Sequence, residues 1–142
     1  MYRARDGRIL VVDDRTRIAS GSPFEPTIGF SRAVRVGDLV VVSGTGPVFP
    51  QGDACPDDAG RQARRCFELI RAALEGAGAS MEHVVRTRMF VTRAEDADAV
   101  GAVHSELLGH VRPAATMVVV AGLLDPAWRV EIEADAVVAE GR

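Results

Sequence analysis

Two periodicities of hydrophobic residues divide this chain into expected helices and strands. The clearest helix follows Asp57 and Asp58, either of which can cap its start, and Gly76 and Gly78 can end it. Its apolar side chains recur at the spacing of one helix face, and charged residues take the other side. The apolar set is Ala63, Cys66, Phe67, Ile70, Ala73, Leu74 and Ala77.

A second helix is predicted from the capping-box sequence that runs from Thr92 to Glu95. In such a box the threonine oxygen and the glutamate carboxylate satisfy backbone N–H groups at the helix start. The helix is expected to continue to about Leu108. Its buried residues would be Val100, Val103 and Leu107.

Shorter segments with alternating or continuous apolar residues are expected to form strands. They span residues 9–12, 30–36, 39–43, 84–91, 115–121 and 129–138. Gly37 and Asp38 fit a two-residue hairpin turn between the second and third of these strands. The order of elements is typical of an α+β fold with two helices on one face of the sheet. The other face must meet water or another copy, and one domain is expected over residues 1–142.

The last strand alternates strictly between apolar and charged residues. Val130, Ile132, Ala134 and Ala136 share one face, and Arg129, Glu131, Glu133 and Asp135 share the other. If the strand over residues 84–91 is its neighbour, Arg86 and Arg88 would pair with Glu131 and Glu133, each pair contributing about 0.2–1 kcal/mol. Alternatively, a carboxylate in a cleft can act as a general acid or base, and Glu131 is the candidate.

Composition excludes several classes of function. The formal net charge is −3, from 17 basic and 20 acidic residues, and the dispersed arginines form no stripe for nucleic acid. The longest apolar runs have the length of strands, so neither a membrane span nor a signal peptide is expected. Cys55 and Cys66 fit neither a disulfide framework nor a zinc set, and a cytoplasmic protein is expected.

Other motifs favour structural interpretations. His104 lies at the spacing of the buried face of the second helix and is interpreted as a core or interface residue. Ser43 has no nucleophile-elbow motif around it, which argues against a serine hydrolase. Gly44 and Gly46 begin no phosphate-binding loop, because no Gly-Lys-Ser/Thr follows them.

Several ordered segments resemble the RidA/YjgF family over residues 20–138. They are Ser22-Pro23-Phe24-Glu25-Pro26, Gly29-Phe30-Ser31-Arg32-Ala33-Val34-Arg35-Val36-Gly37-Asp38, Val42-Ser43-Gly44-Thr45, Val84-Val85-Arg86-Thr87-Arg88-Met89-Phe90-Val91, Arg112-Pro113-Ala114-Ala115-Thr116-Met117-Val118 and Val130-Glu131-Ile132-Glu133-Ala134-Asp135-Ala136-Val137. The resemblance implies a chorismate-mutase-like fold and a homotrimer around a central barrel, with ligand clefts between subunits. It also implies hydrolysis of reactive enamines or imines without a cofactor or metal.

The same resemblance implies roles for particular positions. The glutamate that handles water in the family corresponds to Glu131, and the serine of the Ser-Gly turn corresponds to Ser43 beside Gly44. Phe30 stands at the tyrosine position and lacks its hydroxyl. Ala115 stands where the family has the arginine that grips the substrate carboxylate.

The expected site is therefore a small and mostly apolar intersubunit cleft. Its residues would be Phe30, Ser43, Gly44, Ala115, Thr116, Met117 and Glu131. Arg88 is the first candidate to replace the missing arginine, and Arg32 and Arg129 are weaker candidates. Alternatively, Arg88 has only a structural role and forms an ion pair with Glu131 or Glu133. The expected ligand is a small imine, enamine or carbonyl compound without a carboxylate. A non-catalytic binding or regulatory trimer is the alternative, and an endoribonuclease or translation inhibitor is less favoured because no basic stripe exists.

Overall fold

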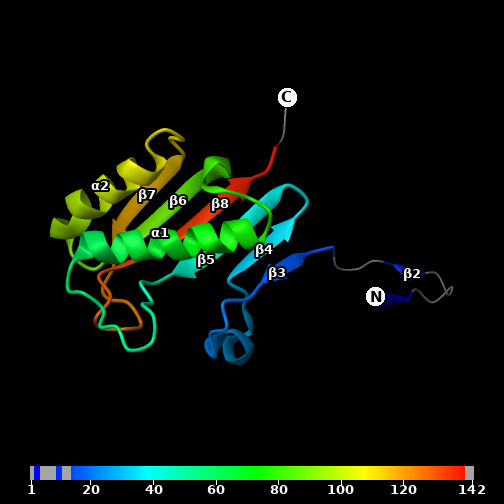
Figure 1. Ribbon diagram of the computed structural model, residues 1–142, viewed down its shortest axis with the longest axis horizontal. Helices are drawn as coiled ribbons and strands as arrows, with labels where there is room; N and C mark the ends of the chain where they lie inside the picture. Colours follow the sequence, from blue (N-terminus) through cyan, green and yellow to red (C-terminus); the bar gives the residue numbers. More distant parts are fainter. Residues whose placement is uncertain (1, 4–8, 11–13, 140–142) are drawn as a thin grey trace.

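The computed structural model describes residues 2–3, 9–10 and 14–139, and its centre is a six-stranded mixed sheet. The strands are β3 (Thr16–Ile18), β4 (Ala33–Val36), β5 (Leu39–Thr45), β6 (Val84–Val91), β7 (Ala114–Val119) and β8 (Val130–Val137). They lie in the order β3-β4-β5-β8-β6-β7 (Figure 1), with β6 and β7 parallel and the other neighbours antiparallel. A separate pair is formed by β1 (Tyr2–Arg3) and β2 (Ile9–Leu10).

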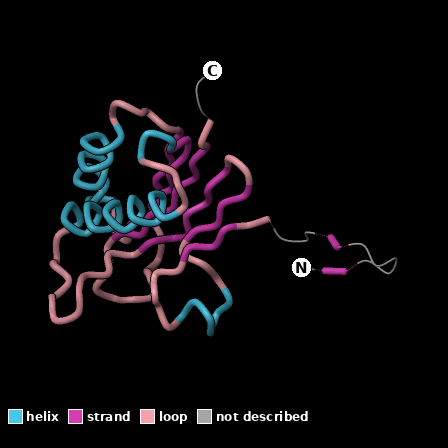
Figure 2. Tube along the Cα trace, turned by 45° about the vertical axis from the view of Figure 1, so that its right-hand side comes forward, coloured by secondary structure: helices cyan, strands magenta, loops and turns pink. Residues whose placement is uncertain are grey.

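Two helices, α1 (Ala59–Gly76) and α2 (Ala97–Leu108), lie together on one face of this sheet, as Figures 1 and 2 show. Asp58 caps α1 by accepting the N–H of Arg61 at 2.8 Å, which is one of the two caps that the sequence allowed. The predicted apolar face of α1 is buried throughout. Its buried members are Ala63, Cys66, Phe67, Ile70, Ala73 and Leu74, with Ala77 just beyond the helix. The α+β prediction with two helices on one face is confirmed.

The strand β8 lies at the centre of the sheet and its two faces differ as predicted. Its apolar face packs under the helices, and none of its four residues is more than 2% exposed; these residues are Val130, Ile132, Ala134 and Ala136. Opposite β8, Arg88 of β6 faces Glu133, while Phe90 faces Glu131. The predicted pairing of Arg86 with Glu131 or Glu133 is wrong, because Arg86 lies opposite Asp135. The alternating pattern determines which face of the sheet a residue lies on. It does not determine the partner, because shifting the neighbouring strand by two residues leaves every side chain on the same face.

The start of α2 differs from the prediction. A short 3-10 turn, η3 (Ala94–Asp96), precedes the helix, and its N-cap is Arg93, without a side-chain capping bond. Thr92 directly follows β6, and its N–H donates to the carbonyl of Arg129, the residue before β8, at 3.1 Å. The predicted capping box at Thr92 is therefore wrong, since this bond holds the backbone of Thr92 outside the start of the helix.

Other boundaries agree within a few residues. The strand predicted over residues 9–12 is described only at Ile9–Leu10, and Val11 and Val12 lie outside the described residues. The short strand β3 was not predicted. Leu108 is fully buried on α2, whereas Leu107 is only partly buried.

The face of the sheet that turns away from the helices is apolar in part. Val41 of β5 and Val118 of β7 are 43% and 42% exposed on it, beside the ion pair of Arg88 and Glu133. A chain with such a face must leave it in water or bury it against another copy. Among the described residues, no helix combines the length and apolar character that crossing a membrane requires.

Candidate functional site

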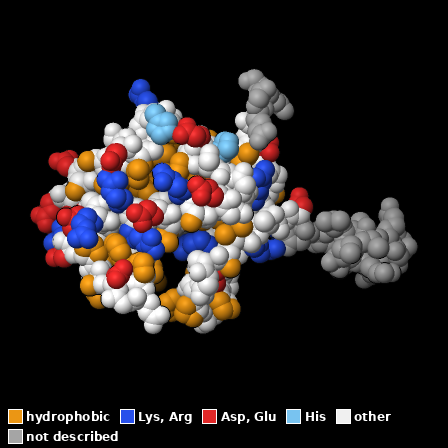
Figure 3. Space-filling model, in the orientation of Figure 1, with side chains coloured by type: hydrophobic (Ala, Val, Ile, Leu, Met, Phe, Trp, Pro, Cys, Tyr) orange, Lys and Arg blue, Asp and Glu red, His pale blue; other side chains and the backbone are white. Residues whose placement is uncertain are grey.

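An elongated cleft of about 1300 Å³ opens at the end of the sheet where β5 finishes and β8 begins. One wall consists of residues 18–24 and Ile28, which belongs to the short turn η1 (Glu25–Gly29), and the other consists of residues 48–50, 124–126 and Trp128. The helix α1 contributes Arg65 and Leu69. In Figure 3 a hollow separates two projecting lobes along the lower edge of the molecule, and apolar side chains gather on both.

Two glycines make room for the side chains at the inner end of this cleft. A Cβ on Gly44 would lie 3.0 Å from Oε2 of Glu131, and a Cβ on Gly46 would overlap the ring of Trp128. Gly44 lies within an irregularity in the pairing of β5 with β8, between Val42 and Thr45. The segment from Gly44 to Gly46 therefore provides the surface against which the carboxylate of Glu131 and the indole of Trp128 pack. The sequence of this segment alone did not indicate that role.

Glu131 is the half-buried carboxylate of the cleft. Burial raises its pKa, the positive charge of Arg32 partly opposes that shift, and the negative charge of Glu133 adds to it. Among the described residues, no hydrogen-bond donor or ion-pair partner contacts its carboxylate. A carboxylate with a raised pKa and free acceptor positions suits proton transfer or the orientation of water.

Arg32 is the cation at the same end of the cleft. Its Nη2 donates to the carbonyl of Gly44 at 2.5 Å, and its Cζ lies 5.9 Å from the ring centre of Phe30. Burial lowers its pKa, while Glu25 and then Glu131 oppose that shift. Its Nε is buried and has no hydrogen-bond partner among the described residues.

Glu25 lies close enough to Arg32 for their charges to interact, and Ser20 holds its carboxylate. Both of its oxygens accept the backbone N–H of Ser20 at 3.2 Å, and the hydroxyl of Ser20 donates to Oε2. The hydroxyl bond is the main reason that the pKa of Glu25 is lowered. Glu25 is therefore a fixed negative charge, and it does not line the cleft.

The structure brings three of the predicted site residues together within one chain, namely Phe30, Gly44 and Glu131. Ser43 is adjacent, but its hydroxyl donates to the carbonyl of Ser31 at 2.7 Å and its N–H to the carbonyl of Arg32 at 3.0 Å. The donors of Ser43 are thus occupied by the backbone rather than directed into the cleft.

The predicted site residues on β7 lie elsewhere in the single chain. Ala115, Thr116 and Met117 pair with β6, and β6 separates them from β8 and Glu131. They can approach the cleft only from a second copy. Arg88 donates to Glu133 at 2.9 Å and lies 3.9 Å from Asp135, which is the structural pairing that the sequence left open. The cleft cation nearest to Gly44 is Arg32, which was a weaker candidate than Arg88 because no local sequence pattern shows that it packs beside Gly44.

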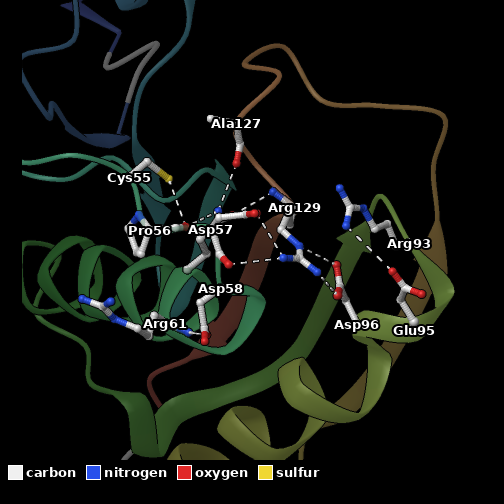
Figure 4. Close-up of polar contacts among 11 residues, drawn as sticks. Cys55, Pro56, Asp57, Asp58, Arg61, Arg93, Glu95, Asp96, Ala127 and Arg129 are labelled. Carbon is white, nitrogen blue, oxygen red and sulfur yellow. Dashed lines mark hydrogen bonds and ion pairs between the residues drawn. The ribbon is translucent and has the colours of Figure 1, made fainter.

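Arg129, the third candidate cation, belongs to a different cluster (Figure 4). Its Nε and Nη2 donate to the two oxygens of Asp96 at 3.0 and 2.6 Å, and its Nη1 donates to Asp57 at 3.1 Å. The buried amide of Gln62 accepts the N–H of Arg129 at 2.7 Å and donates to the carbonyl of Ala127 at 3.0 Å. These bonds fix the segment that carries Trp128 into the cleft wall.

His104 has the structural role that its position on α2 predicted. Its Nε2 lies 2.8 Å from the hydroxyl of Thr87, and its ring meets the edge of Phe67 at 5.8 Å. Burial lowers its pKa, so the neutral form is favoured. Among the described residues, no group of three or more His, Cys, Asp and Glu side chains is placed to hold a metal ion.

Known proteins with similar sequences and folds cover most of this chain. Residues 21–138 match the family model described as Endoribonuclease L-PSP. The chain is 39% identical over 125 residues to an uncharacterised protein of Streptomyces coelicolor, covering 84% of this chain and 90% of that protein. It is 33% identical over 111 residues to the 2-iminobutanoate/2-iminopropanoate deaminase of Salmonella typhimurium, covering 76% of this chain and 86% of the deaminase. A crystal structure from Mycobacterium tuberculosis, described as a member of the YjgF/YER057c/UK114 family, superposes with a TM-score of 0.80 at 46% identity, over 87% of this chain and 99% of that one.

Proposed function

This chain belongs to the endoribonuclease L-PSP family, which is also the RidA/YjgF family, and from that premise we propose that its cleft binds a small imine or enamine and hydrolyses it. The observation that carries the proposal is Glu131, a half-buried carboxylate with a raised pKa and no donor among the described residues. A related protein that is 33% identical bears the name of an imine deaminase, which supports the same reaction class.

The proposed reaction adds one water to a C=N bond and releases ammonia. Glu131 accepts a proton from the attacking water while oxygen bonds to the imine carbon, and it then gives this proton to the imine nitrogen. The hydroxyl of the resulting carbinolamine loses its proton to the same nitrogen as the C–N bond breaks, so that ammonia leaves. An enamine first gains a proton on its carbon and becomes an imine. The products are a carbonyl compound and ammonia, and no electron is gained or lost, so the reaction requires no redox cofactor.

We also propose that the cleft is completed in a homotrimer around a central barrel. The face of the sheet that carries Val41 and Val118 would be buried in such an assembly. The trimer would also bring Ala115, Thr116 and Met117 of a neighbouring copy to Glu131. An interface of this kind is expected to bury about 2,000 Å² or more in total.

A non-catalytic ligand-binding trimer is the second candidate function. Ala115 favours it, because the arginine expected at that position is missing. So does Ser43, whose hydroxyl is already bound to the backbone. In this alternative Glu131 would bind the ligand or pack in the cleft without transferring a proton.

The test of hydrolysis uses 2-aminoacrylate generated in situ, with pyruvate formation followed over time. The wild-type protein is expected to accelerate pyruvate formation at least tenfold over buffer. Absence of acceleration for this substrate and for imines of other amino acids would exclude the hydrolase and leave the binding trimer. A rise in turnover in an Ala115→Arg variant would show that position 115 of a neighbouring copy reaches the cleft.

A further inference from the structure

Arg32 has donors to spare at the point where a ligand would meet Glu131. Only Nη2 forms a hydrogen bond within the described part of the chain, to Gly44, and the buried Nε has no partner there. A guanidinium carries five N–H donors in a planar array that matches a carboxylate. The Nε is shielded from solvent, so a ligand oxygen would be bound by the remaining N–H groups of the two Nη atoms.

Arg32 and Glu131 attract each other without touching. Each opposes the shift that burial causes in the pKa of the other, yet no hydrogen bond or ion pair joins them among the described residues. Gly44 lies between them, since Arg32 donates to its carbonyl and Glu131 packs on its Cα. The missing Cβ of Gly44 therefore lets both side chains contact the same residue, and both line the cleft.

The other arginines near the site are engaged elsewhere. Arg88 is bound to Glu133, and Arg129 is held by Asp96 and Asp57. Arg65 lines the cleft, but it donates to the carbonyl of Val48 at 2.7 Å and to Glu68 at 3.0 Å. Arg32 is thus the cleft arginine with the most unused hydrogen-bonding capacity.

We propose that Arg32 binds the carboxylate or carbonyl oxygen of the ligand, while Glu131 faces the nitrogen on the adjacent carbon. The ligand class is therefore a 2-imino or 2-amino acid, whose opposite charges complement Glu131 and Arg32. This inference rests on the proposed function, because it assigns the anchor of the same cleft. It replaces the expectation of a ligand without a carboxylate, which followed from Ala115 alone.

The walls beyond this pair define the rest of the ligand. Phe24, Ile28, Leu69 and Trp128 line the same cleft as Arg32 and Glu131, and Phe24 and Ile28 are 63% and 65% exposed. Apolar walls of this kind favour an apolar side chain on the ligand. The geometry thus fits a branched or aromatic side chain better than the methyl group of an alanine-derived imine.

The experiment measures binding of two probes of nearly equal shape, 4-methyl-2-oxopentanoate and its primary amide, by calorimetric titration. The wild type is expected to bind the acid roughly 10- to 100-fold more tightly than the amide. Arg32→Gln should lose that preference and keep its affinity for the amide, and Arg32→Lys should keep part of the preference. Arg88→Gln is the matched control and should behave as the wild type.

Each outcome has a separate meaning. The assignment is overturned if the wild type does not prefer the acid, or if Arg32→Gln still prefers it. Unchanged binding of the amide by Arg32→Gln shows that the cleft is folded in that variant. If Arg32→Gln binds neither probe, the Arg32→Lys variant is used instead. An Arg32→Lys variant that still binds the amide but no longer prefers the acid would count against the assignment. Pyruvate formation from 2-aminoacrylate is measured separately. The proposed hydrolysis can therefore be excluded without excluding Arg32 as the binding residue, and Arg32 can be excluded without excluding hydrolysis.

Discussion

Two arginine–carboxylate clusters lie near the start of β8, and they are built in opposite ways. Around Arg129, three guanidinium nitrogens are bound by Asp96 and Asp57, and the backbone N–H is bound by Gln62. Around Arg32, one nitrogen is bound to a carbonyl, a buried nitrogen lacks a partner, and Glu131 accepts no bond from the described residues. A saturated network holds segments together, whereas unsaturated polar groups facing a cleft are placed for a ligand.

The largest expected effect separates activity from stability at the open cluster. Glu131→Gln removes the proton-transferring group and should lower the rate of imine hydrolysis about 10²- to 10⁴-fold. The free energy of unfolding should change by less than about 0.5 kcal/mol, because no bond of the carboxylate to a described residue is lost. Steady-state kinetics and urea unfolding measure the two quantities.

The matched control for that variant is Glu133→Gln, two residues away on the same face of β8. It breaks the pair with Arg88 and should leave the rate of imine hydrolysis within about threefold of the wild type. Equal losses of rate in both variants would mean that the charge of the face matters, rather than the position of Glu131.

At the closed cluster the expected effect is on stability. Arg129→Met leaves Asp96, which is only 4% exposed, as a buried charge without its partner. Breaking such a pair is expected to lower the free energy of unfolding by about 3 kcal/mol, measured by urea unfolding. The double variant Arg129→Met/Asp96→Leu should recover part of the loss, and no recovery would show that the arginine acts mainly through Asp57.

A smaller effect is expected where the two clusters meet, at Trp128. Gly46→Ala places a Cβ into the indole ring and should lower the free energy of unfolding by about 1–3 kcal/mol. Trp128 is the only tryptophan in the chain, so its fluorescence reports the displacement directly. Gly101→Ala is the control, because its Cβ meets nothing within 4 Å and the helix should gain about 0.5–1 kcal/mol.

The smallest effect is the pH dependence of stability, which should have opposite signs at Glu131 and Glu25. The raised pKa of Glu131 gives stability that is complete below the pKa of an unfolded glutamate and is lost as the pH rises through the raised value. The free energy of unfolding of Glu131→Gln should therefore rise relative to that of the wild type between roughly pH 4 and 7, by less than about 0.5 kcal/mol.

The lowered pKa of Glu25 gives stability that is present above the unfolded value and is lost on acidification. The free energy of unfolding of Glu25→Gln should accordingly fall furthest below that of the wild type at neutral pH, and the difference should be smallest in acid. Urea midpoints measured across the pH range test both variants. Parallel pH curves for wild type and Glu131→Gln would contradict the assignment of Glu131 as a buried acid.

Local patterns in the sequence were sufficient for the main elements and not for the contacts between them. The buried face of α1 and the bounds of β6 follow from periodicity, which depends on residues close in the chain. The pairing of Arg88 with Glu133 depends on register, which the face pattern permits in several ways.

The proximity of some predicted site residues followed from the family resemblance, whereas contacts that depend on packing did not. Glu131, Phe30 and Gly44 were expected together and line one cleft of the single chain, while their roles and the intersubunit cleft stay predictions. The proximity of Arg32 to Glu131 arises because β4 and β8 both flank β5, and no local motif records that neighbour relation. The same holds for Gly46, whose partner Trp128 is far along the chain.

The most direct test of the open cluster is a crystal structure of the protein with 4-methyl-2-oxopentanoate. We expect the ligand carboxylate within hydrogen-bonding distance of Arg32, its carbonyl carbon facing Glu131, and its side chain against Trp128. A ligand bound through Arg88 or Arg129, with Arg32 and Glu131 facing only solvent, would contradict the account.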